Sequence, residues 1–166
     1  MADGFFENNE TNQRKIIEVI RKYQPEIVLC NAINDRHPDH GRASKLTSDA
    51  CFYSGLIKIE TLHNDTKQNA WRPKALYHYI QDQFIKPDFV IDITKYNDKK
   101  MESIMAYSSQ FYDPNSKEPQ TPISSKNFME YINAKASVFG RAINVDYAEG
   151  FTVDRYIGVN SLFDLK

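Results

Sequence analysis

Apolar and polar positions follow one another along the chain in blocks that predict an α/β protein. Residues 12–23, NQRKIIEVIRKY, place their apolar side chains on one side at helical spacing, with Thr11 or Asn12 as a cap and Pro25 as a stop. Residues 26–32, EIVLCNA, form a short apolar run that is typical of a buried strand. A helix followed by such a strand is half of an α/β unit.

A second helix is predicted from about Asp39 to Ser54, with its end at Gly55. Pro38 suits its first turn, because the N–H that proline lacks would have no partner there. The apolar positions of this segment predict which side chains are buried. The expected buried face consists of Leu46, Ala50, Cys51 and Phe52.

The rest of the chain continues the alternation of helices and strands. We expect a loop at 60–73, strands at 74–80 and 88–94, a helix at 98–111, a proline-rich loop at 112–122, a helix from a cap at Ser124 or Ser125 to about Gly140, and a last strand-like stretch at 143–153. We find no internal repeat, low-complexity stretch or domain boundary. Residues 1–166 are therefore interpreted as a single domain.

Composition narrows the classes of function. A chain of 166 residues with 41% hydrophobic content can bury a core, and its net charge of −1 provides no field for a nucleic acid. No apolar run approaches the roughly 18 residues of a membrane span, and the first residues lack the features of a signal peptide. Cys30 and Cys51 form no CxxC pair, so we expect two reduced, buried thiols in a cytoplasmic protein.

Residues 34–40, NDRHPDH, combine two imidazoles, two carboxylates and a guanidinium directly after the expected strand at 26–32. The carboxyl ends of strands in α/β sheets are where ligands bind. Imidazole and carboxylate are the usual ligands of a divalent ion such as zinc, and the second imidazole could act as a charged donor or general acid. Asp39 could fix the orientation of one imidazole, and the planar fork of Arg36 suits a substrate carboxylate.

A polar loop that merely caps a helix remains the alternative interpretation of this motif. It explains Pro38 and Asp39 without any chemistry. Two histidines and one aspartate also do not close a catalytic zinc site, which has three protein ligands and an open position. Of the other histidines, His63 is expected to be solvated, and His78 alternates with tyrosines on a strand and is expected to be structural.

The HPDH motif after an apolar strand resembles the second signature of the LmbE-like, or PIG-L, N-acetylglucosaminyl deacetylases. Longer segments resemble the bacillithiol-biosynthesis deacetylases of that family: IIEVIRKYQPEIVLCNA, DRHPDHGRASKL, AYSSQFYDPNS and AEGFTV. The likeness extends from Ala2 to Leu165. It implies a Rossmann-like α/β fold with a parallel-rich sheet flanked by helices. It also implies zinc-dependent hydrolysis of an N-acetyl group from a glucosamine conjugate, N-acetylglucosaminyl malate in the bacillithiol branch.

The resemblance also implies roles for the residues of the motif. His40 would be the zinc ligand, and His37 would be the charged imidazole that stabilises the tetrahedral oxyanion or protonates the leaving amine. Asp39 would orient and tune His37. Arg36 would face the substrate, and its contact with a malate carboxylate is our inference from charge. Other residues in matching segments, which either line the pocket or are structural, are Tyr107, Gln110, Tyr147 and Glu149.

One signature of the family is not found in this sequence. Family members begin with a strand and an AHPDD-type loop that supplies a His and an Asp to the zinc and another Asp as general base. This sequence starts at MADGFF, so we expect a truncated chain that lacks the first strand or strands and a helix of the family fold. It would lack the remaining ligands, expose sheet edges, and have weak or no activity. A divalent metal other than zinc is left open.

Two hypotheses from other classes compete with a deacetylase. Arg36, His37 and the aromatic side chains, ten Tyr and ten Phe, could form a non-catalytic module that binds a sugar or a partner chain. The loop at 112–122 and the apolar C-terminal tail could instead mediate a homo-oligomer. For the deacetylase, the expected partner is a small-molecule amino-sugar substrate, with neither a nucleic acid nor a membrane involved.

Overall fold

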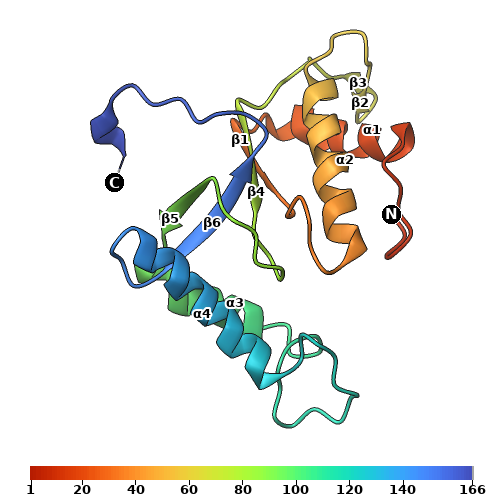
Figure 1. Cartoon of the computed structure of the whole chain (residues 1–166). Coiled ribbons are helices and arrows are strands. Elements are labelled where there is room, and N and C mark those ends of the chain that lie inside the picture. Colours follow the sequence, from red (N-terminus) through yellow and green to blue (C-terminus); the bar gives the residue numbers. More distant parts are fainter. Residues whose placement is uncertain (166) are drawn as a thin grey trace. The chain divides into compact units, whose positions relative to one another are not determined.

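The structure is a computed structural model that describes residues 1–165, and it divides into two compact units. The first unit contains Met1–Asp88 and Phe151–Asn160, and the second contains Phe89–Gly150 and the residues from Ser161 onward. Both units contain helices and strands (Figure 1). The α/β class is confirmed, and the interpretation as a single domain stays a prediction.

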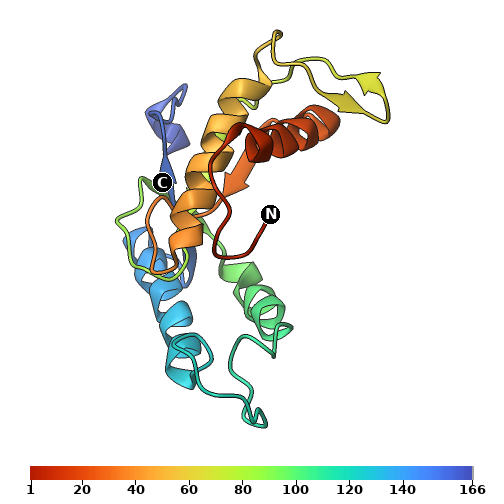
Figure 2. The ribbon, with the colours of Figure 1, turned by 90° about the vertical axis from the view of Figure 1, so that its right-hand side faces the viewer.

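The first unit contains most of the sheet and the two helices that pack with it. Its elements are α1 (Glu10–Tyr23), β1 (Ile27–Cys30), α2 (Pro38–Ser54), β2 (Leu62–His63), β3 (Thr66–Lys67) and β4 (Ala75–Tyr79). Figure 2 shows α1 beside α2, with the β2–β3 hairpin beyond one end of α2. The helices and longer strands confirm the predicted pattern.

Helix α1 starts earlier than its apolar residues predict. Asn9, rather than Thr11 or Asn12, is the cap, and its side chain accepts the Asn12 N–H at 3.1 Å. Asparagine is among the best N-cap residues, and Glu10 in the first turn suits the positive end of the helix dipole. The helix ends at Tyr23 and is capped by Gln24, which has a φ of 47° and donates its N–H to Ile20 O.

Strands β1 and β4 lie parallel, with Cys30 opposite His78. Strand β4 also pairs antiparallel with β6 (Ala148–Val153), and the four strands of the sheet follow the order β1-β4-β6-β5. In the first unit α1 and α2 pack against each other, and residues of both helices form the core. This core cluster comprises Ile17, Ile20, Ala50 and Cys51.

The buried face of α2 agrees with the sequence at three of four positions. Leu46, Ala50 and Cys51 are buried, whereas Phe52 is 56% exposed. The expectation for Phe52 was wrong because its ring lies on the surface under the Arg72 guanidinium, 4.5 Å from ring centroid to cation. A cation over an aromatic face stabilises such a ring without burial in the core.

The segment 60–73, expected to be a loop, contains a short hairpin. Strands β2 and β3 pair antiparallel, with His63 opposite Thr66. Between them Asn64 and Asp65 have φ values of 49° and 59°. Positive φ at both central residues defines the tight turn that matches the twist of hairpin strands, and Asn and Asp tolerate it well.

The second unit contains strand β5 and two helices. Its elements are β5 (Phe89–Asp92), the 3₁₀ turn Thr94–Tyr96, α3 (Asn97–Met105), α4 (Lys126–Ala142), the start of β6, and a 3₁₀ turn at Leu162–Asp164. Helix α3 ends six residues before Phe111, because the next residues form a separate turn with Gln110 N–H bonded to Tyr107 O at 2.9 Å. Helix α4 begins after a Ser125 cap, as predicted.

Candidate functional site

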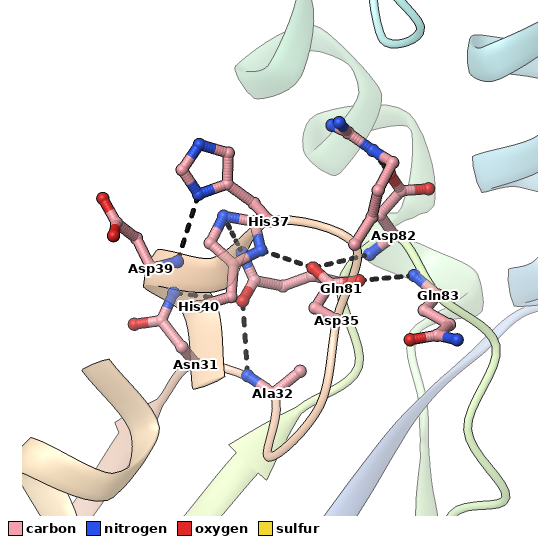
Figure 3. Close-up of polar contacts among 10 residues, drawn as sticks. Asn31, Ala32, Asp35, His37, Asp39, His40, Gln81, Asp82 and Gln83 are labelled. Carbon is pink, nitrogen blue, oxygen red and sulfur yellow. Dashed lines mark hydrogen bonds and ion pairs between the residues drawn. The ribbon is translucent and has the colours of Figure 1, made fainter. Parts of the chain in front are cut away.

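The candidate site lies in the first unit, where two parallel strands end. Because β1 and β4 run in the same direction, the segments that follow them leave the same edge of the sheet. The residues after β1 lead through NDRHPDH into α2, and residues 80–83 follow β4. Figure 3 shows side chains of both segments in contact.

His40 is held by a carboxylate that sequence reasoning did not assign. Its Nδ1 hydrogen-bonds Asp35 Oδ2, and the side chain of His40 is 29% exposed while that of Asp35 is fully buried. Burial alone would raise the pKa of Asp35. Hydrogen bonds from Gln83 N–H, at 2.6 Å, and from the His40 ring outweigh burial, so the pKa of Asp35 is lowered and a carboxylate is favoured.

The other ring nitrogen of His40 faces an amide. Gln81 Oε1 accepts the Asn31 Nδ2–H at 3.0 Å and the Ala32 N–H at 3.2 Å. These two donors fix which end of the amide is oxygen, so the Gln81 NH₂ group is the one turned toward His40 Nε2, at 3.4 Å (Figure 3). An amide donor on one nitrogen and a carboxylate on the other favour a proton on Nδ1 and a lone pair on Nε2.

His37 is the N-cap of α2. Its Nδ1 accepts the Asp39 N–H at 3.2 Å, and its ring centroid lies 5.4 Å from that of His40. A ring that accepts through Nδ1 carries its proton on Nε2, so His37 is placed to donate a hydrogen bond through Nε2. The charged role that was expected of it stays a prediction.

Asp39 contacts His37 through its backbone. Its carboxylate accepts the Gly4 N–H at 2.7 Å and pairs with Arg42 Nη1 at 2.7 Å. Arg42 in turn donates to Gly4 O at 2.8 Å. In the part of the chain that the structure describes, the carboxylate that hydrogen-bonds an imidazole of the motif belongs to Asp35. The expected orientation of His37 by the Asp39 carboxylate stays a prediction.

Arg36, expected to bind a substrate anion, makes an ion pair within the chain. Its Nε lies 2.6 Å from Asp82 Oδ2, and its side chain is 45% exposed. Asp82 follows β4, so this pair joins the same two segments as Gln81 does. A guanidinium has five N–H donors, and a bond through Nε leaves its terminal nitrogens available for an incoming carboxylate.

The metal-binding potential of these residues is limited to one imidazole. No group of three or more His, Cys, Asp or Glu side chains within residues 1–165 is arranged to hold a metal ion. His40 Nε2 suits a single coordination bond, because its lone pair faces away from the carboxylate on Nδ1. The described residues thus fit one ligand of a zinc site but do not supply a complete set.

The other candidates lie elsewhere. His63 is exposed on β2, as expected, and His78 is 1% exposed within the sheet, which agrees with a structural role. The four further candidates belong to the second unit, where Glu149 pairs with Lys100 at 2.6 Å. The residues in that group are Tyr107, Gln110, Tyr147 and Glu149.

Sequence reasoning missed Asp35 and Gln81 as parts of the site. Asp35 lies inside NDRHPDH, five positions before His40. Its position just before a helix was the signal in the sequence that could have assigned it to the site. Gln81 is distant in sequence, and only the parallel pairing of β1 with β4 brings it close. Knowledge of that pairing would have predicted that residues after the two strands meet.

Comparison with known proteins shows the fold. No model of a protein family matches the chain. A conserved protein from Thermus thermophilus matches with a TM-score of 0.80 and 25% identity over 96% of this chain and 65% of its own. GalB, the 4-carboxy-2-hydroxymuconate hydratase from Pseudomonas putida, gives 0.71 and 21% over 93% of this chain and 62% of its own. The N,N'-diacetylchitobiose deacetylase from Pyrococcus horikoshii gives 0.73 and 20% over 100% and 60%.

These likenesses define a class of fold. The chain has a mixed α/β fold, with a sheet that contains parallel strands and is flanked by helices, and it shares this fold with a deacetylase and a hydratase. It spans 60–65% of the length of the three solved chains. One fold can host different chemistries, so the site must decide the function. Among the described residues, no helix is long and apolar enough to cross a membrane.

Proposed function

We propose that this chain belongs to a metal-dependent N-deacetylase that hydrolyses an N-acetylglucosamine conjugate, with N-acetylglucosaminyl malate of bacillithiol biosynthesis as the expected substrate. The observation that carries the proposal is the arrangement of His40, whose Nδ1 bonds Asp35 and whose Nε2 lies 3.4 Å from the Gln81 amide, at the end of the parallel strands where ligands bind in α/β sheets. The shared fold with a diacetylchitobiose deacetylase supports it. We expect a cytoplasmic enzyme.

Three residues of the motif then have a definite task. His40 would hold a zinc ion, which when bound polarises the amide oxygen and lowers the pKa of a water molecule. His37, with its proton on Nε2, would donate a hydrogen bond to the oxygen that becomes negative during attack on the acetamide. Arg36 would bind a carboxylate of the substrate, such as that of malate.

The proposal assigns neither the remaining metal ligands nor the general base to this sequence, because residues 1–165 contain no metal-binding group of three or more side chains. A single imidazole cannot hold zinc tightly. The isolated chain is therefore expected to release little or no acetate, whatever the activity of the larger site.

The test is acetate release by the protein expressed from the longest reading frame that contains this sequence. N-acetylglucosaminyl malate and zinc are supplied, and the metal is then removed with a chelator. We expect release that the chelator abolishes, and that His40→Ala and His37→Ala each reduce by at least about 100-fold. His63→Ala is the matched control, because this histidine is exposed on a hairpin of the same unit.

Two results would contradict the proposal. One is the absence of acetate release from every N-acetylglucosamine conjugate that is tried. The other is release that persists unchanged in His40→Ala. Saturable binding of the sugar without metal, retained in His40→Ala, would instead support the alternative of a non-catalytic sugar-binding module.

A further inference from the structure

We propose that Asp35 is a positioning residue that places the proton of His40 on Nδ1 and presents Nε2 as the atom that binds the metal. The metal-binding part of this inference rests on the proposed function, but the position of the proton does not. Asp35 acts through His40, so its effect is measurable on the ring itself.

The first argument comes from the Nδ1 side of the ring. In a neutral imidazole one nitrogen donates and the other accepts. An ionised carboxylate only accepts, so its hydrogen bond with Nδ1 requires the proton to be there. The Asp35 side chain is fully buried, which means that water does not compete for this bond.

The second argument comes from Nε2 and is independent of Asp35. The oxygen of the Gln81 amide is occupied by two N–H donors, from Asn31 and Ala32. The NH₂ group that remains can only donate, and it faces Nε2 at 3.4 Å. A donor at that position favours a lone pair on Nε2, so both sides of the ring favour the same tautomer.

Asp35 is also unsuited to bind a metal directly. Its Oδ1 accepts the Gln83 N–H at 2.6 Å, and its Oδ2 bonds His40 and lies 3.5 Å from the Asp82 N–H. Both oxygens are thus directed at groups of the protein. These bonds tie the segment after β4 to the start of α2 and fix the plane of the His40 ring.

The consequence for the metal follows from general experience with metal-bound histidines. Such histidines usually donate their second N–H to a carboxylate or carbonyl, and loss of that partner weakens metal binding by about 10- to 100-fold. Asp35 occupies this place for His40. It therefore sets the affinity of the site without touching the metal.

The first measurement is nitrogen NMR of the histidine rings in the folded, metal-free chain. We expect His40 to carry its proton on Nδ1. Asp35→Ala should remove this preference. Gln81→Glu should favour a proton on Nε2 as well, because a carboxylate oxygen then replaces the amide donor. The exposed ring of His63, observed in the same spectra, is the internal control and should not change.

The second measurement is a zinc titration of the protein expressed from the longest reading frame that contains this sequence, followed through the His40 resonances. Asp35→Ala and Asp35→Asn should weaken the zinc-dependent shifts by about 10- to 100-fold, and His40→Ala should abolish them. Asp35→Asn keeps the shape of the side chain and gives the same readout if the alanine variant does not fold.

The outcomes separate this inference from the proposed function. A wild-type His40 with its proton on Nε2 would overturn the positioning role, whatever the acetate assay shows. An Asp35→Ala variant with unchanged tautomer and unchanged zinc response would do the same. A proton on Nδ1 that depends on Asp35, in a protein that releases no acetate, would support the positioning role and contradict the deacetylase.

Discussion

His40 and His78 belong to the same unit, and each has a carboxylate near one ring nitrogen, yet their surroundings differ. His78 lies inside the sheet and is 1% exposed, and its Nε2 is 3.4 Å from Asp154 Oδ1 without a hydrogen bond among the described residues. The side chain of His40 is 29% exposed, and its Nδ1 bonds Asp35. A nearby carboxylate alone therefore does not distinguish a histidine that could bind a metal from one that stabilises the fold.

The difference lies in what surrounds the other nitrogen. His78 Nδ1 has three neighbours within hydrogen-bond distance: Ser44 Oγ at 2.9 Å, Asn31 O at 3.1 Å and Cys30 Sγ at 3.1 Å. Its ring thus connects β1, α2 and β4. His40 Nε2 has only the Gln81 amide at 3.4 Å among the described contacts. A ring that joins three elements stabilises the fold, whereas a ring with one accessible lone pair can bind a ligand.

The largest expected effect separates the two histidines by stability. His78→Leu should lower the free energy of unfolding by about 2–4 kcal/mol, because it leaves the Asn31 carbonyl and the Ser44 hydroxyl buried without this partner. His40→Ala should lower it by less, about 1 kcal/mol, since this ring is partly exposed and the buried Asp35 carboxylate keeps its bonds from the Gln83 and Asp82 N–H groups. Urea unfolding of both variants measures the comparison. Equal losses of unfolding free energy would show that the difference in burial does not give the two histidines different roles in stability.

The second effect concerns the thiols near His78. Burial, with smaller contributions from Cys51 and Asp154, raises the pKa of Cys30 to about 12, and burial together with Asp154 raises that of Cys51 to about 11. Unfolded thiols ionise near pH 8.5. Above that pH the unfolded chain releases protons that the folded chain keeps, so stability is present at lower pH and falls as pH rises.

We expect this loss to be about 1 kcal/mol per pH unit for each thiol between roughly pH 9 and 11. Cys30→Ala should remove the share of one thiol and make the dependence of the unfolding midpoint on pH shallower. Cys51→Ala should do the same to a similar degree. A pH dependence that neither substitution changes would contradict the assignment to buried thiols.

The smallest effect is expected at the exposed side of the His40 region. Asp82→Asn breaks the ion pair with Arg36, whose side chain is 45% exposed. Exposed ion pairs stabilise weakly and are screened by salt, so the change in unfolding free energy should be at most about 0.5 kcal/mol. Unfolding at low and high salt measures it. A loss above about 2 kcal/mol would show that this pair is part of the core network.

The regular elements of the fold were predictable because their signals are local. Helix α2 begins and ends where Pro38 and Gly55 predict, and Ser125 caps α4 as expected. The hairpin at Asn64 and Asp65 was missed because its strands have only two residues each, too few for a visible alternation. Asn9 was missed as a cap because apolar spacing locates the middle of a helix better than its start.

The site was predictable only in part, because its contacts join distant segments. His37, Asp39 and His40 stand together in one motif, and the structure places all three at the start of α2. Their hydrogen bonds depend on residues that periodicity does not connect to them. Gln81 reaches His40 only through strand pairing, and the Asp39 carboxylate is taken by the backbone of Gly4. Motifs identify reactive residue types, whereas partners follow from topology.

The long contact between Gln81 and His40 has a consequence for how the site opens. At 3.4 Å it lies beyond the usual range of an N–H donor and its acceptor, so it is weak. The Gln81 amide thus contacts His40 Nε2, but little energy opposes its displacement from that nitrogen. Exchange of the amide for an incoming ion should be fast and reversible, with the Gln81 side chain kept close by its bonds to Asn31 and Ala32.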